Sequence, residues 1–253
     1  MKGSSAKNRL KALILAGGRG KRLNEYTRET NKCMMNFNGK PLIEHSLENS
    51  LKLNVAEIVI VVGYLAEQII NHYGNAFKGT PIKYVIQKEQ HGLVHAMECA
   101  KETVGASDFI LMLGDEFFIA PNHQQMLGFF RKEGIFAICG VILVEDMKLI
   151  NKTYSILYDK DTKQIFRLIE KPANPTNHFM GTGNIIFSNR ILDYIAKTPV
   201  SPQRGEKELP DLIQCAVDDR RKVCYHVLAA RYVNVNAAED TLLIKSLAKE
   251  LPS

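Results

Sequence analysis

The chain has 253 residues, which is long enough for an α/β protein with an ample core. Apolar residues make up 45% and charged residues 24%, as is ordinary for a globular protein. No apolar run approaches the roughly 20 residues that span a bilayer, so no membrane partner is expected. The net charge of +6 is spread along the sequence without interleaved aromatic residues, which favours small phosphorylated substrates over a nucleic-acid partner.

Apolar runs of strand length alternate with amphipathic stretches of helix length in the first half of the sequence. Such alternation predicts a parallel sheet with crossover helices. Pro41 suits the first turn of its helix, because the N–H group that proline lacks has no helical partner there. The expected strands are residues 10–16, 57–62, 82–86 and 109–113, and the expected helices are residues 41–53, 65–73 and 93–102.

The pattern loosens in the second half, where shorter β-like segments appear between the helices. We expect helices at 122–132, 190–197 and 209–217, a long strand at 135–144, shorter strands at 154–158, 165–169, 184–187 and 223–228, and a terminal helix from Ala238. The predicted fold class is therefore α/β, with an open, mostly parallel, Rossmann-like sheet, crossover helices and a smaller β-rich part.

The cysteines are scattered without a C-x-x-C pair, which argues against a disulfide scaffold or a zinc site and favours a cytoplasmic location. Two of them, Cys99 and Cys139, lie in apolar patterns and are interpreted as core residues, not nucleophiles. The five cysteines are Cys33, Cys99, Cys139, Cys215 and Cys224.

Three unusual segments directly follow predicted strands. They are residues 17–23, residues 87–92 and the Gly114-Asp115 pair. Ligands of an open parallel sheet bind outside the carboxyl ends of its strands. If these strands are parallel, all three segments meet at one edge of the sheet.

The first segment is a glycine loop with basic residues among the glycines. Glycine adopts positive φ freely and lets a ligand approach, so the backbone N–H groups of the loop can point at an anion. Together with Lys32, the loop offers what a triphosphate needs, whereas the alternative is a tight turn without a ligand. The loop residues are Gly17, Gly18, Arg19, Gly20, Lys21 and Arg22.

Two common phosphate-binding motifs do not fit this loop. A dinucleotide fingerprint needs a small residue at Leu23 and an acidic residue after the next strand, where Gly63 stands. A P-loop needs glycine in place of Leu15 and Ser or Thr in place of Arg22. If the loop binds phosphate, it therefore does so through another motif.

Asp115 ends an apolar strand, directly after Gly114. Mg²⁺ prefers oxygen ligands and bridges phosphate oxygens, so a carboxylate at this position suits a magnesium site. The alternative is an N-cap for the segment that follows. The D-x-D pattern of glycosyltransferases is absent, because Glu116 and Phe117 follow the aspartate.

Residues 15–23, followed by Lys32, resemble the G-G-x-G-T-R-L signature of the sugar nucleotidylyltransferases. Residues 39–43 match the family's G-K-P-L-I segment, and Leu113-Gly114-Asp115 is similar to its L-G-D metal motif. Gln87, with residues 92–96, resembles the base-binding segment of UTP–glucose-1-phosphate uridylyltransferases.

The resemblance extends into the second half of the chain. Glu170-Lys171-Pro172 and Gly181-Thr182-Gly183 match two acceptor-side motifs, and residues 205–211 resemble a later G-E-x-E-x-x-D segment. In all it covers residues 11–243. It implies one nucleotidyltransferase domain over residues 1–253, with a nucleotide-binding half at 10–120 and an acceptor-binding half at 121–253.

The resemblance also implies a role for each matching residue. Arg22, Lys32 and Lys171 would be catalytic, with Arg22 holding the leaving phosphates and Lys32 stabilising charge at the α-phosphate. The nucleotide site would be formed by Leu15, Ala16, Gly17, Gly18, Arg19, Gly20, Lys21, Gln87 and Gly92. The acceptor site would be formed by Glu170, Lys171, Thr182 and Gly183.

Three positions depart from the family pattern. Lys21 replaces a threonine, and Asn31 replaces the proline before Lys32. Where a second metal aspartate is expected, the sequence offers Asn234 or Asn236. We expect Mg²⁺ on Asp115 and Asn234, although asparagines can also merely shape such a turn.

The expected activity joins a nucleoside triphosphate (UTP first, then dTTP or CTP) to a sugar phosphate and releases pyrophosphate. His95 is interpreted as a neighbour of the base pocket and not as a catalytic base. Two alternatives remain: a cytidylyltransferase acting on a non-sugar phosphate or phosphonate, and a non-catalytic sensing subunit. A homo-oligomer is possible.

Overall fold

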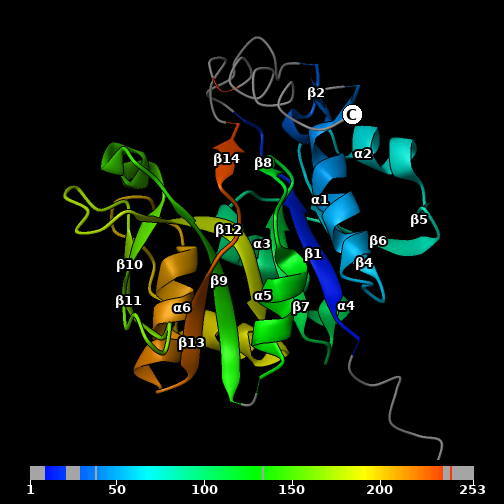
Figure 1. Cartoon of the computed structure of the whole chain (residues 1–253). Helices are drawn as coiled ribbons and strands as arrows, with labels where there is room; N and C mark the ends of the chain where they lie inside the picture. The colour runs from blue at the N-terminus through cyan, green and yellow to red at the C-terminus, as the bar shows by residue number, and fades with distance from the viewer. Residues whose placement is uncertain (1–8, 21–28, 38, 133, 236–239, 241–253) are drawn as a thin grey trace, which may run out of the picture.

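The computed structural model describes residues 9–20, 29–37, 39–132, 134–235 and 240. The strands of its main sheet are β1 (Lys11–Ala16), β4 (Ile58–Val62), β5 (Ala76–Phe77), β6 (Thr80–Ile86), β7 (Phe109–Leu113), β9 (Ile135–Leu143), β12 (Phe179–Phe187) and β13 (Lys222–Val227). In the described part of the chain these eight strands follow the order β13-β9-β12-β7-β1-β4-β6-β5 (Figure 1).

Most neighbouring strands of this sheet are parallel. β1 pairs in parallel with β4 and β7, β4 with β6, and β9 with β13. β12 runs antiparallel to both β7 and β9, and the short β5 runs antiparallel to β6. The predicted α/β fold with an open, mostly parallel sheet is confirmed.

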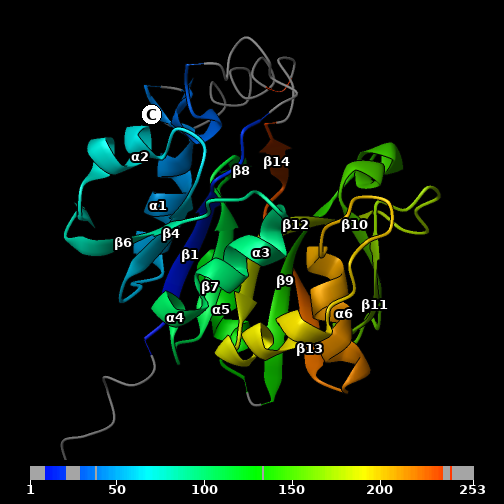
Figure 2. The same cartoon turned by 180° about the vertical axis from the view of Figure 1, so that it is seen from behind.

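Helices cover both faces of the sheet, as expected for crossover connections. They are α1 (Leu42–Lys52), α2 (Ala66–Tyr73), α3 (Gly92–Cys99), α4 (Lys101–Val104), α5 (His123–Phe130), α6 (Leu209–Asp218) and the 3₁₀ helices η2 (Lys32–Met34), η3 (Met147–Lys152) and η4 (Asn189–Lys197). α1 and α5 lie on the face toward the viewer in Figure 1, whereas α3, η4 and α6 lie on the opposite face, seen in Figure 2.

The sheet has an apolar core on each face, and alternating side chains of each central strand contribute to one core or the other. Ile14 and Ile60 pack with Leu47 of α1 on one face. Leu13, one position earlier in β1, packs with Met97 of α3 on the other face. Because successive strand residues point to opposite faces, strands buried on both sides are apolar throughout, which is why the sequence shows them as uninterrupted runs.

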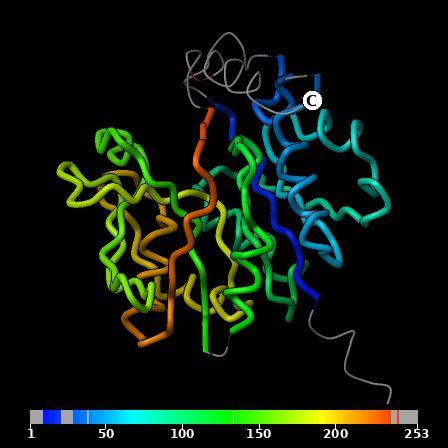
Figure 3. Tube along the Cα trace, in the orientation of Figure 1, coloured from blue at the N-terminus to red at the C-terminus, as the bar shows by residue number. Residues whose placement is uncertain are grey.

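Smaller antiparallel ribbons flank the sheet: β2 (Asn36–Phe37) with β3 (Lys40–Pro41), β8 (Glu116–Ile119) with β14 (Arg231–Asn234), and β10 (Tyr154–Tyr158) with β11 (Ile165–Glu170). The chain trace shows β14, from the end of the described chain, running beside β8 from its middle (Figure 3). None of the described helices combines the length and the apolar character that a bilayer-spanning segment requires.

Four expectations from the sequence need correction. The helix predicted at 93–102 is interrupted at Ala100 and forms α3 and α4, and the one predicted at 190–197 is 3₁₀. β12 begins at Phe179, five residues before the predicted strand. The prediction missed its first residues because two glycines interrupt the apolar pattern there. β8 and β14 were not predicted. The terminal helix expected from Ala238 lies outside the described residues, apart from Asp240.

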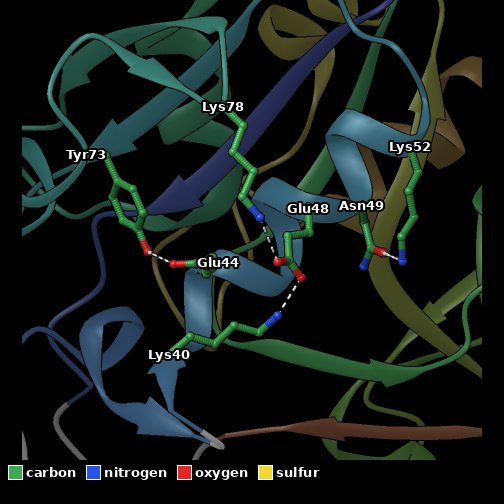
Figure 4. Close-up of polar contacts among 7 residues, drawn as sticks. All are labelled: Lys40, Glu44, Glu48, Asn49, Lys52, Tyr73 and Lys78. Atoms are coloured by element: carbon green, nitrogen blue, oxygen red, sulfur yellow. Dashed lines mark hydrogen bonds and ion pairs between the residues drawn. The ribbon is translucent and has the colours of Figure 1, made fainter. Parts of the chain in front are cut away.

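Polar contacts attach α1 to its surroundings (Figure 4). The Glu48 carboxylate forms ion pairs with Lys40, which precedes the helix, and with Lys78, which follows β5. The hydroxyl of Tyr73, at the end of α2, donates a hydrogen bond to Glu44 at 3.4 Å. These contacts fix α1 against α2 and the edge of the sheet.

His45 of α1 carries a titratable group that is largely buried. Its ring packs edge-on against Phe117, with 4.7 Å between the centroids. Its Nε2 atom is buried and forms no hydrogen bond with the described residues. Burial, aided by the positive charge of Lys40, lowers the pKa of His45 to about 4.

Replacing His45 with phenylalanine should make the protein relatively more stable in acid. Between pH 6.5 and 4 the unfolded chain binds a proton at His45 that the folded chain does not. The free energy of unfolding of the wild type therefore decreases as the pH is lowered through this range. The difference in the free energy of unfolding between variant and wild type should change by at most about 3 kcal/mol across this pH range. Urea unfolding from pH 4 to 8 measures it, with the exposed His72→Phe as control. A constant difference for His45→Phe would contradict the assignment.

Candidate active site

Two adjoining cavities, of about 260 and 300 Å³, open at the carboxyl ends of the central parallel strands. They share Gly92, Leu93, Leu113, Asp115 and Glu206. The three segments that follow predicted strands therefore do meet at one edge of the sheet. We call the two the first cavity and the second cavity.

The first cavity contains most of the residues predicted for the nucleotide. Its walls include Leu15, Ala16, Gly17, Gly18, Gly20, Gln87 and Gly92, together with Lys32 and Asp115. Arg19 lies outside these walls, and its guanidinium stacks over the ring of Tyr64 at 5.2 Å. Lys21 and Arg22 lie outside the described residues.

The amino group of Lys32 lies 2.6 Å from the carboxylate of Asp115. The Lys32 side chain is only 8% exposed, and that of Asp115 is 22% exposed, so the pair is partly screened from water. The pair thus places an amino group and a carboxylate in the wall of the first cavity. The two residues come from η2 and from the end of β7, two segments that the sequence separates by 83 positions.

Asn31, one of the departures from the family pattern, positions Lys32. It is fully buried, and its Oδ1 accepts a hydrogen bond from the N–H of Cys33 at 2.8 Å, which caps η2. Its Nδ2 donates to the carbonyl of Tyr64 at 2.7 Å and to that of Ala16 at 3.4 Å. The asparagine thus ties the η2 turn to the ends of β1 and β4, which a proline could not do through its side chain.

The second cavity contains the residues predicted for the acceptor. Glu170, Lys171, Thr182 and Gly183 line it, together with Arg204, Glu206 and Glu208, and Lys152. The amino group of Lys171 lies 2.8 Å from the Glu170 carboxylate. Lys171 itself adopts a φ of +41°, and its N–H donates to the carbonyl of Thr153.

Arg204 is a cation of this cavity that the motif comparison did not single out. Its guanidinium lies 3.1 Å from Glu208, 3.8 Å from Glu206 and 3.9 Å from Glu170. Burial raises the pKa of Glu208, and the nearby Glu170 carboxylate raises it further. Arg204 directly precedes the G-E-x-E-x-x-D segment, and this position is the signal in the sequence that could have identified the arginine.

The end of β14 places an amide beside Asp115. Asn234 lines the second cavity with Asp115, and the N–H of Val235 donates to the carbonyl of Asp115 at 3.0 Å. The Oδ1 atom of Asn234 is buried and accepts no hydrogen bond from the described residues. A carboxylate and an amide whose oxygen has no partner among the described residues line the same cavity, and Mg²⁺ prefers oxygen donors of this kind. Asn236, the other predicted ligand, lies outside the described residues.

Comparison with known proteins shows the family of the chain. The nucleotidyl transferase family matches residues 11–232. The chain belongs to this family. It is 33% identical over 216 residues to the UTP–glucose-1-phosphate uridylyltransferase AglF of Haloferax volcanii, which covers 85% of the chain and 86% of that protein.

A second relative of this nucleotidyl transferase is the glucose-1-phosphate thymidylyltransferase of Streptomyces griseus, with 28% identity over 95% of the chain and 66% of that protein. Among solved structures, a putative glucose-1-phosphate thymidylyltransferase from Bacillus anthracis superposes with a TM-score of 0.85 at 22% identity, covering 96% of the chain and 97% of that structure. A UDP-glucose pyrophosphorylase complexed with UDP-glucose superposes with a TM-score of 0.86 at 19% identity, covering 96% of the chain and 99% of that structure. These structures share the fold of the nucleotidyl transferase.

Thr182 and Gly183 of the nucleotidyl transferase direct their hydrogen-bonding groups into the protein. The hydroxyl of Thr182 donates to the carbonyl of Gly140 at 2.9 Å, and the N–H of Gly183 donates to Glu116 at 2.8 Å. The structure therefore makes these two residues part of the cavity wall. A contact with the acceptor would have to come from other atoms of this segment.

Glu116 lines the second cavity, and the sequence assigned it no function. Its carboxylate is 2% exposed and accepts hydrogen bonds from Gly183, from the Asn184 amide at 2.7 Å and from the Tyr232 hydroxyl at 2.7 Å. Burial raises the pKa of Glu116 to about 7, against the lowering effect of these donors. One side chain thus fastens β8, β12 and β14 together behind Asp115.

Replacing Gly183 with alanine should destabilise the protein by about 1–3 kcal/mol, the usual cost of overpacking a core. A Cβ atom at this position would collide with the side chain of Leu113 and lie 3.1 Å from the Glu116 carboxylate. Gly128→Ala is the matched control, because α5 leaves open space there. It should stabilise the helix by up to about 1 kcal/mol. Urea unfolding compares the two, and equal effects would contradict the close packing at Gly183.

Proposed function

We propose that this chain transfers a nucleotidyl group from a nucleoside triphosphate to a sugar-1-phosphate and releases pyrophosphate. UTP is the preferred donor, followed by dTTP or CTP. The observation that carries the proposal is the Lys32–Asp115 pair, which lies where the glycine-loop cavity meets the cavity of Lys171 and Arg204. The relatives named for uridylyl and thymidylyl transfer to glucose-1-phosphate support it.

The proposed reaction is an in-line displacement at the α-phosphorus of the triphosphate. An oxygen of the acceptor's phosphate forms the new P–O bond, and the bond to the bridging oxygen of pyrophosphate breaks. A phosphate monoester is already ionised at neutral pH, so no general base is needed. Catalysis then consists of positioning the two phosphates and stabilising the negative charge of the transition state.

The cations of the two cavities have separate tasks in this reaction. Lys171 and Arg204 hold the phosphate of the acceptor, and Lys32 stabilises the charge that develops on the α-phosphate. Arg22 is assigned to the leaving phosphates from its motif alone, because it lies outside the described residues. The carboxylates around Arg204 would accept hydrogen bonds from acceptor hydroxyls once the arginine turns to the phosphate.

Asp115 and Asn234 would hold Mg²⁺ at the boundary of the two cavities. When bound there, the ion would neutralise charge on the phosphate oxygens of the donor. An amide ligand carries no formal charge, so this pair would bind the free ion less tightly than two carboxylates. A cytoplasmic location is part of the proposal, because all five cysteines are free thiols.

Pyrophosphate release should require both a phosphorylated acceptor and Mg²⁺. A panel of five nucleoside triphosphates against sugar-1-phosphates, choline phosphate and aminoalkyl phosphonates tests this, and Asp115→Asn serves as the impaired control. A rate that is the same without any acceptor would contradict the transferase. CTP with a non-sugar acceptor as the best pair would favour the cytidylyltransferase, and binding without turnover for every pair would favour the sensing subunit.

Asn234→Ala should raise the Mg²⁺ concentration needed for half-maximal turnover, because it removes a metal ligand. Asn234→Asp should leave that concentration equal or lower it, since a carboxylate binds Mg²⁺ more tightly than an amide. Titrations of pyrophosphate release with magnesium measure both effects. Asn54→Ala is the control, because Asn54 is an asparagine with a positive φ that does not line either cavity. If Asn234→Ala loses thermal stability but keeps the wild-type magnesium curve, the asparagine only shapes the turn.

A further inference from the structure

Gln87, which follows β6, is 5% exposed and forms part of the wall of the first cavity. Its Nε2 atom lies 3.2 Å from the carbonyl oxygen of Gly92 and 3.1 Å from Nδ1 of His95. A backbone carbonyl can only accept hydrogen bonds, so the NH₂ end of the Gln87 amide must be the end that faces Gly92. The orientation of this amide is therefore fixed by its partners.

The same argument fixes the protonation of His95. Both N–H bonds of the Gln87 amide are committed, one to Gly92 and one to His95, so Nδ1 of His95 must be the acceptor. The ring is then neutral with its proton on Nε2, the atom that lies 3.7 Å from the Sγ of Cys99 one turn farther along α3. His95 thus acts on Gln87 through a lone pair.

The other end of the amide points toward the glycine loop. A Cβ atom on Gly17 would lie 2.9 Å from Oε1 of Gln87, and Gly17 lines the first cavity. No described residue donates a hydrogen bond to this oxygen. An acceptor on a residue that lines the cavity, without a donor among the described residues, is available to a ligand.

We infer that His95 is a specificity-determining positioning residue, which holds the Gln87 amide so that its oxygen faces the base. Uracil and thymine carry an N–H donor at N3, which this oxygen can accept. Cytosine carries a lone pair at N3, so two acceptors would face each other. A site built for one hydrogen-bonding edge rejects the wrong one because its own polar group is left unpaired. The inference rests on the proposed function, since it assigns the base edge within the same cavity.

Two substitutions at one position test the role of His95. His95→Leu removes the acceptor, whereas His95→Asn places an amide oxygen close to the position of Nδ1. The measured quantity is the ratio of kcat/KM for UTP to that for CTP, with one acceptor. His95→Leu should lower this ratio by about tenfold, the effect of losing one hydrogen bond of about 1.4 kcal/mol. His95→Asn should restore most of it.

Two further variants keep the test specific. His91→Leu removes the neighbouring ring, 5.3 Å from His95, and should leave the ratio unchanged because His91 has no contact with Gln87 among the described hydrogen bonds. In a Gln87→Ala background, His95→Leu should change the ratio little. An equal change in both backgrounds, or a loss in His95→Asn as large as in His95→Leu, overturns the inference.

Failure of the inference and failure of the proposed function give different results. A wild-type protein that uses UTP and CTP equally well overturns the assignment of the base edge, while acceptor-dependent release of pyrophosphate still supports the transferase. A protein that releases no pyrophosphate with any pair contradicts the function itself. In that case the binding of UMP and CMP to the same variants still reports on the orientation of Gln87.

Discussion

The ion pair between Lys32 and Asp115 is the contact around which the site is organised. Its nitrogen and oxygen lie 2.6 Å apart, and the Lys32 side chain is only 8% exposed, so separating the two side chains would cost the attraction between two partly buried charges. The pair fixes the η2 turn to the end of β7, and Asn31 fixes the same turn to β1 and β4. Three strand ends and one loop are thereby held at a single point between the cavities.

The second cavity shows how the protein stabilises its binding charges before a ligand arrives. Arg204 and Lys171 are cations in a partly enclosed space, and Glu170, Glu206 and Glu208 offset their charge. In the proposed function, an incoming phosphate would compete with these carboxylates for the cations. The carboxylates released in this exchange would become acceptors for the rest of the ligand. The arrangement therefore favours a molecule that carries both an anion and hydrogen-bond donors.

The sequence predicts the central strands closely because their signal is local. β1, β4 and β7 are apolar runs that end at glycines, and the predicted bounds differ from the observed ones by at most one residue. β8 and β14 could not be predicted, because the pairing of Glu116 with Asn234 joins residues more than a hundred positions apart. The network of Glu116 depends on the same kind of contact, because its partners Gly183, Asn184 and Tyr232 lie 67 to 116 positions away in the sequence.

The antiparallel direction of β12 explains why the acceptor motif occurs where it does in the sequence. In parallel strands the edge that binds ligands is reached at the carboxyl end, and the glycine loop, residues 87–92 and Gly114-Asp115 each follow their strand. β12 runs the other way, with Ile185 opposite Leu111 of β7. Its first residues, including Gly181, Thr182 and Gly183, therefore lie at the edge where β7 ends. Reversing one strand brings a motif that precedes the apolar core of β12 next to Asp115, and so builds a second cavity beside the first.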